Sequence, residues 1–105
     1  MRGETTPGVI IAYRLGEGPR SRVSRFTERF LGQDRRENGR TYRRRGTLDT
    51  IPHWKVSRGV LVVRAQDRRH VVRELRKWTR EVVVWPIPLT HQQLRRLTRP
   101  TFRTG

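Results

Sequence analysis

The stretch VSRGVLVVR, residues 56–64, carries the clearest strand signal in this chain. Residues 60–63 form an uninterrupted apolar run made of valine and leucine, and valine is a β-branched residue that favours strands. A short apolar run of this kind, bounded by polar residues, is typical of a buried strand. The sequence therefore predicts one strand over residues 56–64, with residues 60–63 as its buried centre.

On the C-terminal side of this strand, the apolar pattern changes to the period of a helix. Asp67 suits the N-cap position, and the apolar residues that follow recur on one side of a helix. The valine-rich stretch 81–87 then predicts another strand. Pro86 and Pro88 would end that strand, because proline cannot donate a hydrogen bond to a strand ladder.

On the N-terminal side, residues 9–15 predict a strand at the centre of a sheet. Their nearly continuous apolar character suggests burial on both faces. A helix is then predicted from Pro19, which suits a first helical turn, to Gly32, a residue type that commonly ends helices. Phe26 and Phe30 stand one turn apart in this helix, so they would face the core together.

The segment between these two regions is the most polar part of the domain. Residues 33–40 contain Asn38-Gly39 and are predicted to form a loop. Residues 41–48 begin with a tyrosine and three arginines and predict a short exposed edge strand or an ordered arm. Residues 49–54 contain Ile51-Pro52, which argues against a regular element there.

The predicted order is strand, helix, strand, strand, helix and strand, followed by a short helix that starts at a capping box of Thr90 and Gln93. This order predicts an α+β fold, a ferredoxin-like βαββαβ sandwich with a short C-terminal helix and basic tails. Residues 1–8 would form a flexible lead, residues 9–97 a single domain, and residues 98–105 a basic tail. The sheet face without helices would be polar, or covered by a partner, a second copy or nucleic acid.

The charge of the chain points to a polyanionic partner. The formal net charge is +16, from 25 Lys and Arg against 9 Asp and Glu, and every basic residue except Lys55 and Lys77 is arginine. Self-repulsion at this charge opposes a compact state, and nucleic acid relieves it while releasing counterions. Arginine also binds phosphate in a two-point geometry and stacks on bases. A basic surface that serves solubility alone is the alternative, although acidic residues serve solubility better.

Four groups of residues are candidates for contact with nucleic acid. The stretch RTYRRRG at residues 40–46 has arginines on both faces of a strand and a tyrosine that offers a stacking surface for unpaired bases. The helix after Asp67 carries an arginine stripe, the end of the chain is basic, and Trp54 follows a loop where an exposed ring would meet a base. The candidates are Arg40, Tyr42, Arg43, Arg44, Arg45, Trp54, Arg69, Arg73, Arg76, Arg95, Arg96 and Arg99.

Each of these groups also has a simpler interpretation, and these alternatives stay open. Charges on residues 40–46 would protect an exposed strand edge from pairing with other chains. The stripe would equally serve as a solvated helix face, and the basic end of the chain as a disordered tail. Trp54 would close the edge of the core instead of binding a base.

The sequence predicts no cofactor, no metal site and no enzymatic activity. The chain lacks cysteine, its three histidines are scattered, and Gly16-Glu17-Gly18 lacks the further glycine and lysine of a phosphate-binding loop. A metal-dependent nuclease is the enzymatic alternative and would use Asp49 or Asp67. No apolar stretch approaches the ~20 residues of a membrane span, so we expect a cytoplasmic protein. The absence of cysteine and the single methionine, beside abundant charge, also fit a thermophile.

Two resemblances add to this interpretation. The segments YRRRG (42–46), LD (48–49), IPH (51–53) and RGV (58–60) resemble those of small basic archaeal proteins of uncharacterised function. This likeness extends over residues 9–90, and it implies an archaeal source and association with RNA or the ribosome. The order of elements is also similar to that of the ferredoxin-like CRISPR spacer-acquisition protein, a dimer that holds DNA. Its first strand ends in a hydrophobic-Tyr-Asp sequence, where this chain has Ala12-Tyr13-Arg14, and an arginine in place of that Asp puts the nuclease chemistry in doubt.

Together these features predict an RNA-binding protein that contacts phosphates through arginines, as a component of the ribosome or of another ribonucleoprotein. The alternative is a DNA-binding homodimer of the spacer-acquisition or chromatin type, and an adaptor for an acidic protein is a further possibility. Phosphate contacts position a protein without reading bases, so we expect affinity to dominate over sequence specificity.

Overall fold

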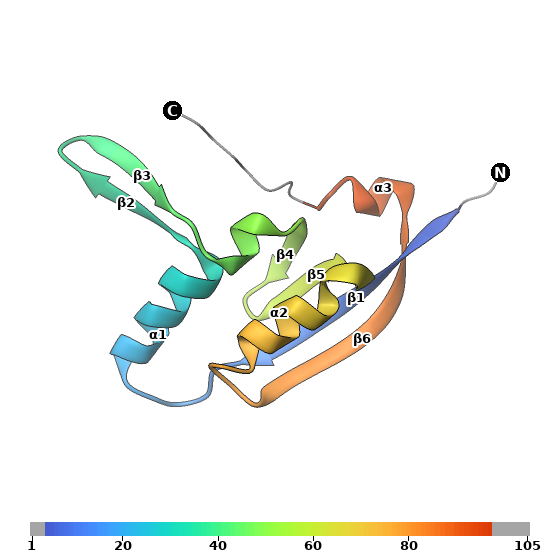
Figure 1. Cartoon of the computed structure of the whole chain (residues 1–105), viewed down its shortest axis with the longest axis horizontal. Coiled ribbons are helices and arrows are strands. Elements are labelled where there is room, and N and C mark those ends of the chain that lie inside the picture. Colours follow the sequence, from blue (N-terminus) through green and yellow to red (C-terminus); the bar gives the residue numbers. More distant parts are fainter. Residues whose placement is uncertain (1–3, 98–105) are drawn as a thin grey trace.

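The computed structural model describes residues 4–97 and shows a mixed α+β fold (Figure 1). The strands are β1 (Thr5–Arg14), β2 (Gln33–Glu37), β3 (Arg40–Arg44), β4 (His53–Ser57), β5 (Val60–Arg64) and β6 (Glu81–Thr90). The helices are α1 (Arg20–Phe26), the π-helix η1 (Thr27–Leu31), the 3-10 helices η2 (Thr47–Thr50) and η3 (Ala65–Asp67), α2 (Arg68–Leu75) and α3 (His91–Leu94). The main sheet is antiparallel and four-stranded, in the order β4-β5-β1-β6, and β2 and β3 pair in a separate two-stranded sheet. No helix of residues 4–97 is long and apolar enough to cross a membrane.

Strand β1 lies between β5 and β6 and is apolar on both faces, which confirms the prediction of a central strand. Val9 and Ile11 are buried in the cluster that also contains residues of α1 and α2. Ile10 points to the opposite face and packs with Val62. Gly8 leaves room for Leu89 to pack on the sheet, because a Cβ at Gly8 would overlap that side chain.

Aromatic rings fill the core between the sheet and the helices. Phe26 and Phe30 stack with their ring centroids 5.2 Å apart, and Tyr13 and Trp78 pack against this pair. Both phenylalanines are buried, which confirms their predicted place. Burial raises the pKa of the Tyr13 hydroxyl above its ordinary value, an effect that Arg58 partly offsets. Gly32, with φ of 84°, ends the helical segment as predicted.

The prediction of a single strand over residues 56–64 is wrong, because the chain reverses within it. Arg58-Gly59 forms the turn between β4 and β5, and Gly59 adopts a φ of 81° that favours glycine. The Gly59 carbonyl accepts a hydrogen bond of 2.8 Å from the Tyr13 N–H. Strand β4 begins at His53, inside the segment predicted to be irregular, because the strand starts only after Ile51-Pro52.

The loop predicted over residues 33–40 is also wrong, because most of it is strand β2. Asn38 and Gly39 have φ of 51° and 75°, the left-handed geometry of a two-residue hairpin turn. The predicted exposed strand within residues 41–48 corresponds to β3, which pairs with β2 and not with the main sheet.

Three further boundaries differ from the prediction. Strand β6 runs through Pro86 and Pro88 to Thr90, because an edge strand tolerates prolines whose nitrogen faces away from its neighbour. The predicted lead over residues 1–8 overlaps β1, which begins at Thr5. Asp67 occupies the N-cap position of α2, but its carboxylate accepts a hydrogen bond of 2.8 Å from Arg64 and does not cap the helix.

The short C-terminal helix agrees with the prediction. The Thr90 hydroxyl accepts a hydrogen bond of 3.1 Å from the Gln93 N–H, and the Gln93 side chain accepts one of 3.0 Å from the Thr90 N–H. This reciprocal pair is the predicted capping box and starts α3. The predicted basic tail over residues 98–105 lies outside the described residues.

Replacement of Phe30 by alanine tests this core. We expect Phe30→Ala to lower the free energy of unfolding by about 3–5 kcal/mol, because it removes a fully buried ring and leaves a cavity. Trp85→Ala is the matched control, since that ring is mostly exposed, and its effect should stay below about 1 kcal/mol. Urea unfolding measures both variants, and equal losses would contradict this account of the core.

Candidate nucleic-acid interface

The β2–β3 hairpin is an arm that stands away from the main sheet (Figure 1). Every residue of both strands is exposed. An isolated two-stranded hairpin is marginally stable in water, so its position depends on contacts at its base. The same arm contains five of the predicted site residues, Arg40, Tyr42, Arg43, Arg44 and, directly after β3, Arg45.

Arg43 fixes the base of the arm. Its guanidinium donates to both carboxylate oxygens of Asp49 at 2.9 and 3.0 Å, and to the Leu31 carbonyl at 2.9 Å. A longer contact of 3.5 Å reaches Asp34 on the paired strand. Asp49 in turn accepts a hydrogen bond of 2.9 Å from the Gly46 N–H. The hydrogen bond to Asp49 raises the pKa of Arg43 above its ordinary value, so this cation is tied to the fold.

Two glycines make room for this contact. A Cβ on Gly32 would overlap Asp49 and Arg43, and a Cβ on Gly46 would overlap the backbone at Phe30 and Gly32. The backbone of η2 therefore lies directly against the end of η1. The sequence shows neither glycine as part of a site, because their role depends on a contact between distant segments.

The neighbouring arginine is also engaged within the protein. Arg44 forms an ion pair of 3.1 Å with Glu28 of η1. Arg45 is exposed directly after β3. Two of the predicted phosphate anchors, Arg43 and Arg44, thus contact η1 and η2, while 43% and 53% of their side chains stay exposed.

The outer part of the arm carries different arginines. Arg35, Arg36 and Arg40 are exposed, and within residues 4–97 none of them has an acidic partner. Tyr42 is 50% exposed and lies directly opposite Arg35 in the register, so the two side chains share one face of the ribbon. Arg35 and Arg36 are not among the predicted site residues, because the sequence predicts a loop over residues 33–40 and gives no sign of strand β2.

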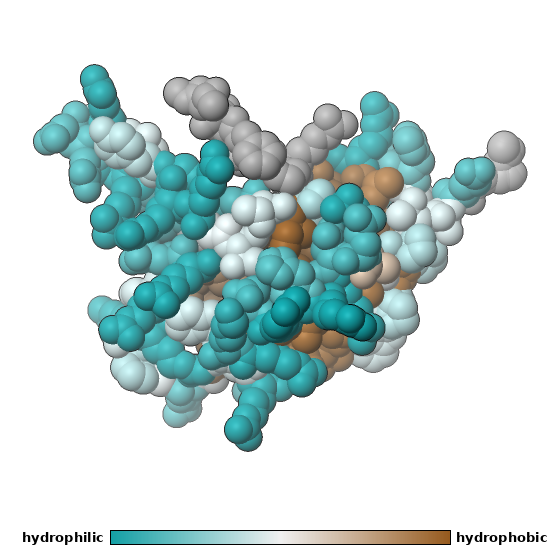
Figure 2. Space-filling view, viewed as in Figure 1, coloured by the Kyte–Doolittle hydropathy of each residue, from teal (hydrophilic) through white to brown (hydrophobic). Residues whose placement is uncertain are grey.

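The arginine stripe on α2 forms one continuous surface, as predicted. A hollow of about 500 Å³ is lined by Arg68, Arg69, Val72, Arg73 and Arg76. The one acid on this helix, Glu74, pairs with Lys77 at 3.0 Å and so leaves the stripe uncompensated. Figure 2 shows hydrophilic residues over the projecting arm and over the side of the molecule that α1 and α2 cover.

Of the remaining predicted residues, Arg95 and Arg96 follow α3, and Trp54 lies in β4. The Arg96 guanidinium stands 5.4 Å from the centre of the Trp54 ring, a distance typical of cation–π contacts. Trp54 belongs to β4 and is half-buried, so it lies in the sheet and not in the predicted loop. Arg95 is exposed after α3, and Arg99 lies outside the described residues.

The acids that a nuclease would need are spread over the molecule. Within residues 4–97 no group of three or more His, Cys, Asp or Glu side chains is placed to hold a metal ion. Asp49 and Asp67 pair with Arg43 and Arg64, respectively. His53 contacts the Ile51 carbonyl at 2.8 Å.

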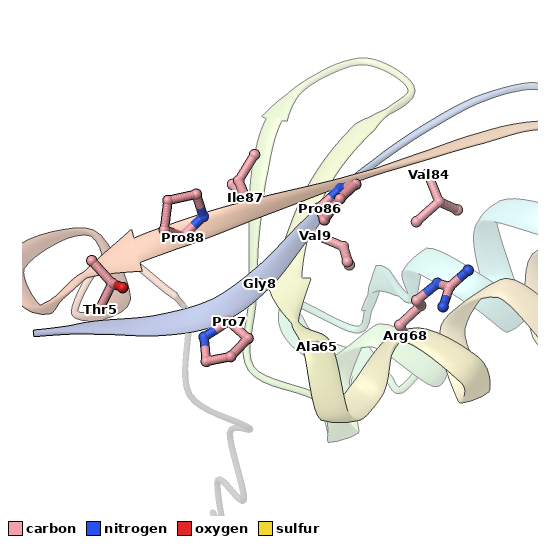
Figure 3. A pocket seen from close by; sticks show the side chains of 10 residues that line it. All are labelled: Thr5, Pro7, Gly8, Val9, Ala65, Arg68, Val84, Pro86, Ile87 and Pro88. Atoms are coloured by element: carbon pink, nitrogen blue, oxygen red, sulfur yellow. The ribbon is translucent and has the colours of Figure 1, made fainter.

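An apolar hollow of about 590 Å³ lies where β1 and β6 extend past the start of α2 (Figure 3). It is lined by Thr5, Pro7, Gly8, Val9, Ala65, Arg68, Val84, Pro86, Ile87 and Pro88. Arg68 is the one ionisable side chain in this lining, so the hollow offers no acid–base pair. This hollow adjoins the basic surface of α2, because Arg68 lines both hollows.

No family model, no curated protein and no solved structure matches this chain. Its function is therefore inferred from its own residues.

Removal of the Arg43 side chain tests its role at the base of the arm. We expect Arg43→Ala to destabilise the protein by about 1–3 kcal/mol, because the largely buried carboxylate of Asp49 loses its main partner. Hydrogen exchange of the β2 and β3 amides should accelerate as well. Arg40→Ala, at the outer end of the same strand, is the control and should leave both quantities near wild type. Equal exchange in the two variants would rule out this role.

Proposed function

We propose that this protein binds RNA through phosphate contacts made by arginines, as a component of the ribosome or of another ribonucleoprotein. The observation that carries the proposal is the uncompensated charge at the outer arm and at the α2 hollow. Like charges at helical spacing repel each other, and the arginines of α2 are grouped in spite of that cost. A phosphate backbone removes the repulsion and releases counterions.

The arm and the α2 stripe are parts of one assembly. Leu48 of η2 is buried in the same cluster as Val71 and Leu75 of α2. The next turn residue, Asp49, holds the arm through Arg43. This connection joins the arm to α2 through η2, and we propose that the two sets of arginines contact one nucleic-acid backbone.

RNA is favoured over DNA by the aromatic residue within the arm. Tyr42 is exposed beside Arg35, and an exposed ring next to arginines suits unpaired bases, which RNA presents in loops and bulges.

Duplex DNA is the second candidate, and the shape of the arm favours it. The major groove of B-form DNA is about 12 Å wide and admits a two-stranded ribbon. This alternative corresponds to a DNA-binding homodimer and requires a dimer in solution without nucleic acid.

We also propose that the fold is ferredoxin-like. With the hairpin arm set aside, the main-sheet strands follow the chain in the order β1, β4, β5 and β6, and all neighbouring pairs are antiparallel. The first strand lies between the third and the fourth, with the second at the edge. This arrangement supports a split βαβ topology in which the β2–β3 arm is an insertion after the first helix.

A salt titration with matched probes tests the function. We expect binding to single-stranded RNA, duplex RNA and duplex DNA to weaken steeply with salt, with RNA preferred near physiological salt. The variant R35E/R36E/R40E should bind all probes more weakly and lower the salt slope by ~0.7–0.9 for each phosphate that it no longer neutralises.

The matched control is R20E/R25E/R29E, which changes the net charge equally at exposed arginines of α1 and η1. It should lose clearly less affinity than the arm variant. Equal losses of affinity in the two variants would show that the arm is not the binding site. Preference of the wild type for duplex DNA, together with a dimer in solution, would favour the second candidate. No binding at low salt by the wild type would overturn the proposal.

A further inference from the structure

The sheet face that points away from α1 and α2 carries an apolar row across all its strands. The register places Trp54 opposite Val62, Val62 opposite Ile10, and Ile10 opposite Trp85. Residues directly opposite each other in antiparallel strands share a face, so the row crosses β4, β5, β1 and β6. The register places a second apolar row beside the first, formed by Val60, Ala12 and Val83.

α3 covers only part of this face. Leu97 is buried there with Leu89. Toward the β6 edge the side chain of Trp85 is 64% exposed and that of Val83 is 52% exposed. These two residues are neighbours on one face of β6 and form a small exposed apolar patch, a feature found at many binding surfaces.

Arginines stand at both ends of the same face. Arg14 ends β1 there, where its side chain is highly exposed and forms a weak surface ion pair of 3.2 Å with Glu81. At the other end, Arg96 lies over the Trp54 ring. The face thus combines flat apolar rings with cations at its borders.

This combination suits nucleic acid better than a second copy of the chain. A copy facing this surface would bring its own charge of +16 against an equal charge. Extension of the sheet from the β6 edge is also hindered, because Pro86 and Pro88 lack the N–H groups that a new strand would need.

We propose that this face binds the unpaired bases of a single-stranded RNA segment, which stack on Trp85, while the arginines at its borders contact phosphates. The inference rests on the proposed function and adds a second surface to it. Stacking on an indole requires the open face of a base, which a duplex hides except at its ends. The surface would therefore select unpaired segments, whatever their sequence.

The open part of the row is small. Val62 is buried beside Leu97, and Ile10 and Trp54 pack against the same cluster. The exposed part at Trp85 and Val83 therefore suits a single stacked base.

The test compares two probes of equal length, a single-stranded oligouridine and a sugar-phosphate chain that lacks the bases. We expect wild type to bind the base-containing probe more tightly by a factor on the order of 5 to 150, as one stacked base provides. Trp85→Ala should lose most of this preference, and Trp85→Phe should keep a large share of it. Val56→Ala, at another exposed apolar residue, should behave as wild type.

The experiments distinguish the base-stacking inference at the sheet face from the proposed function at the arm. The arm variant R35E/R36E/R40E should weaken binding of both probes alike and keep the preference for bases. Equal binding of both probes by wild type would overturn the base-stacking inference and leave the proposed function standing. If Trp85→Ala instead converts a dimer into a monomer without changing the base preference, the face is a dimer interface and the inference is wrong. The urea midpoint of Trp85→Ala establishes that the variant is folded.

Discussion

The carboxylate of Asp49 accepts hydrogen bonds from the Arg43 guanidinium and the Gly46 N–H, and so joins the end of the hairpin arm to η2. The same turn places Leu48 in the core beside Phe30. The arm has no apolar core of its own, because every residue in its strands is exposed. Its direction is therefore set by one polar contact at the edge of the main core, and the surface that we assign to phosphates depends on that contact.

The sequence predicted those elements whose residues are buried in a periodic pattern. The central strand at residues 9–15, the helix that carries Phe26 and Phe30, and the capping box at Thr90 all correspond to observed features. The predictions are wrong where the residues are exposed and the sequence shows no apolar periodicity. Strand β2 contains only exposed polar residues, so periodicity could not reveal it. The left-handed turn at Asn38-Gly39 was the available sign of a hairpin.

The candidate site was predictable in kind but not in detail. Composition showed that arginines dominate the surface, and the spacing on α2 correctly grouped its stripe. No local pattern distinguishes Arg43, which is bound by Asp49, from Arg40, which is not, because the acid lies in another element. The place of Trp85 on an open face also depends on the register between β6 and β1, which a single sequence does not specify.

Several acids of this basic chain pair with arginines where two elements meet. Glu28 of η1 pairs with Arg44 of β3, and Glu81 of β6 pairs with Arg14 of β1. Arginines outside these ion pairs lie on α1 and η1 as well as on the outer arm and α2, and we assign the phosphate contacts to the last two groups. A phosphate backbone that binds there adds affinity that falls with salt. Stacking of bases on the opposite sheet face is much less sensitive to salt. The arginines would therefore provide most of the affinity, and the sheet face would provide the preference for unpaired segments.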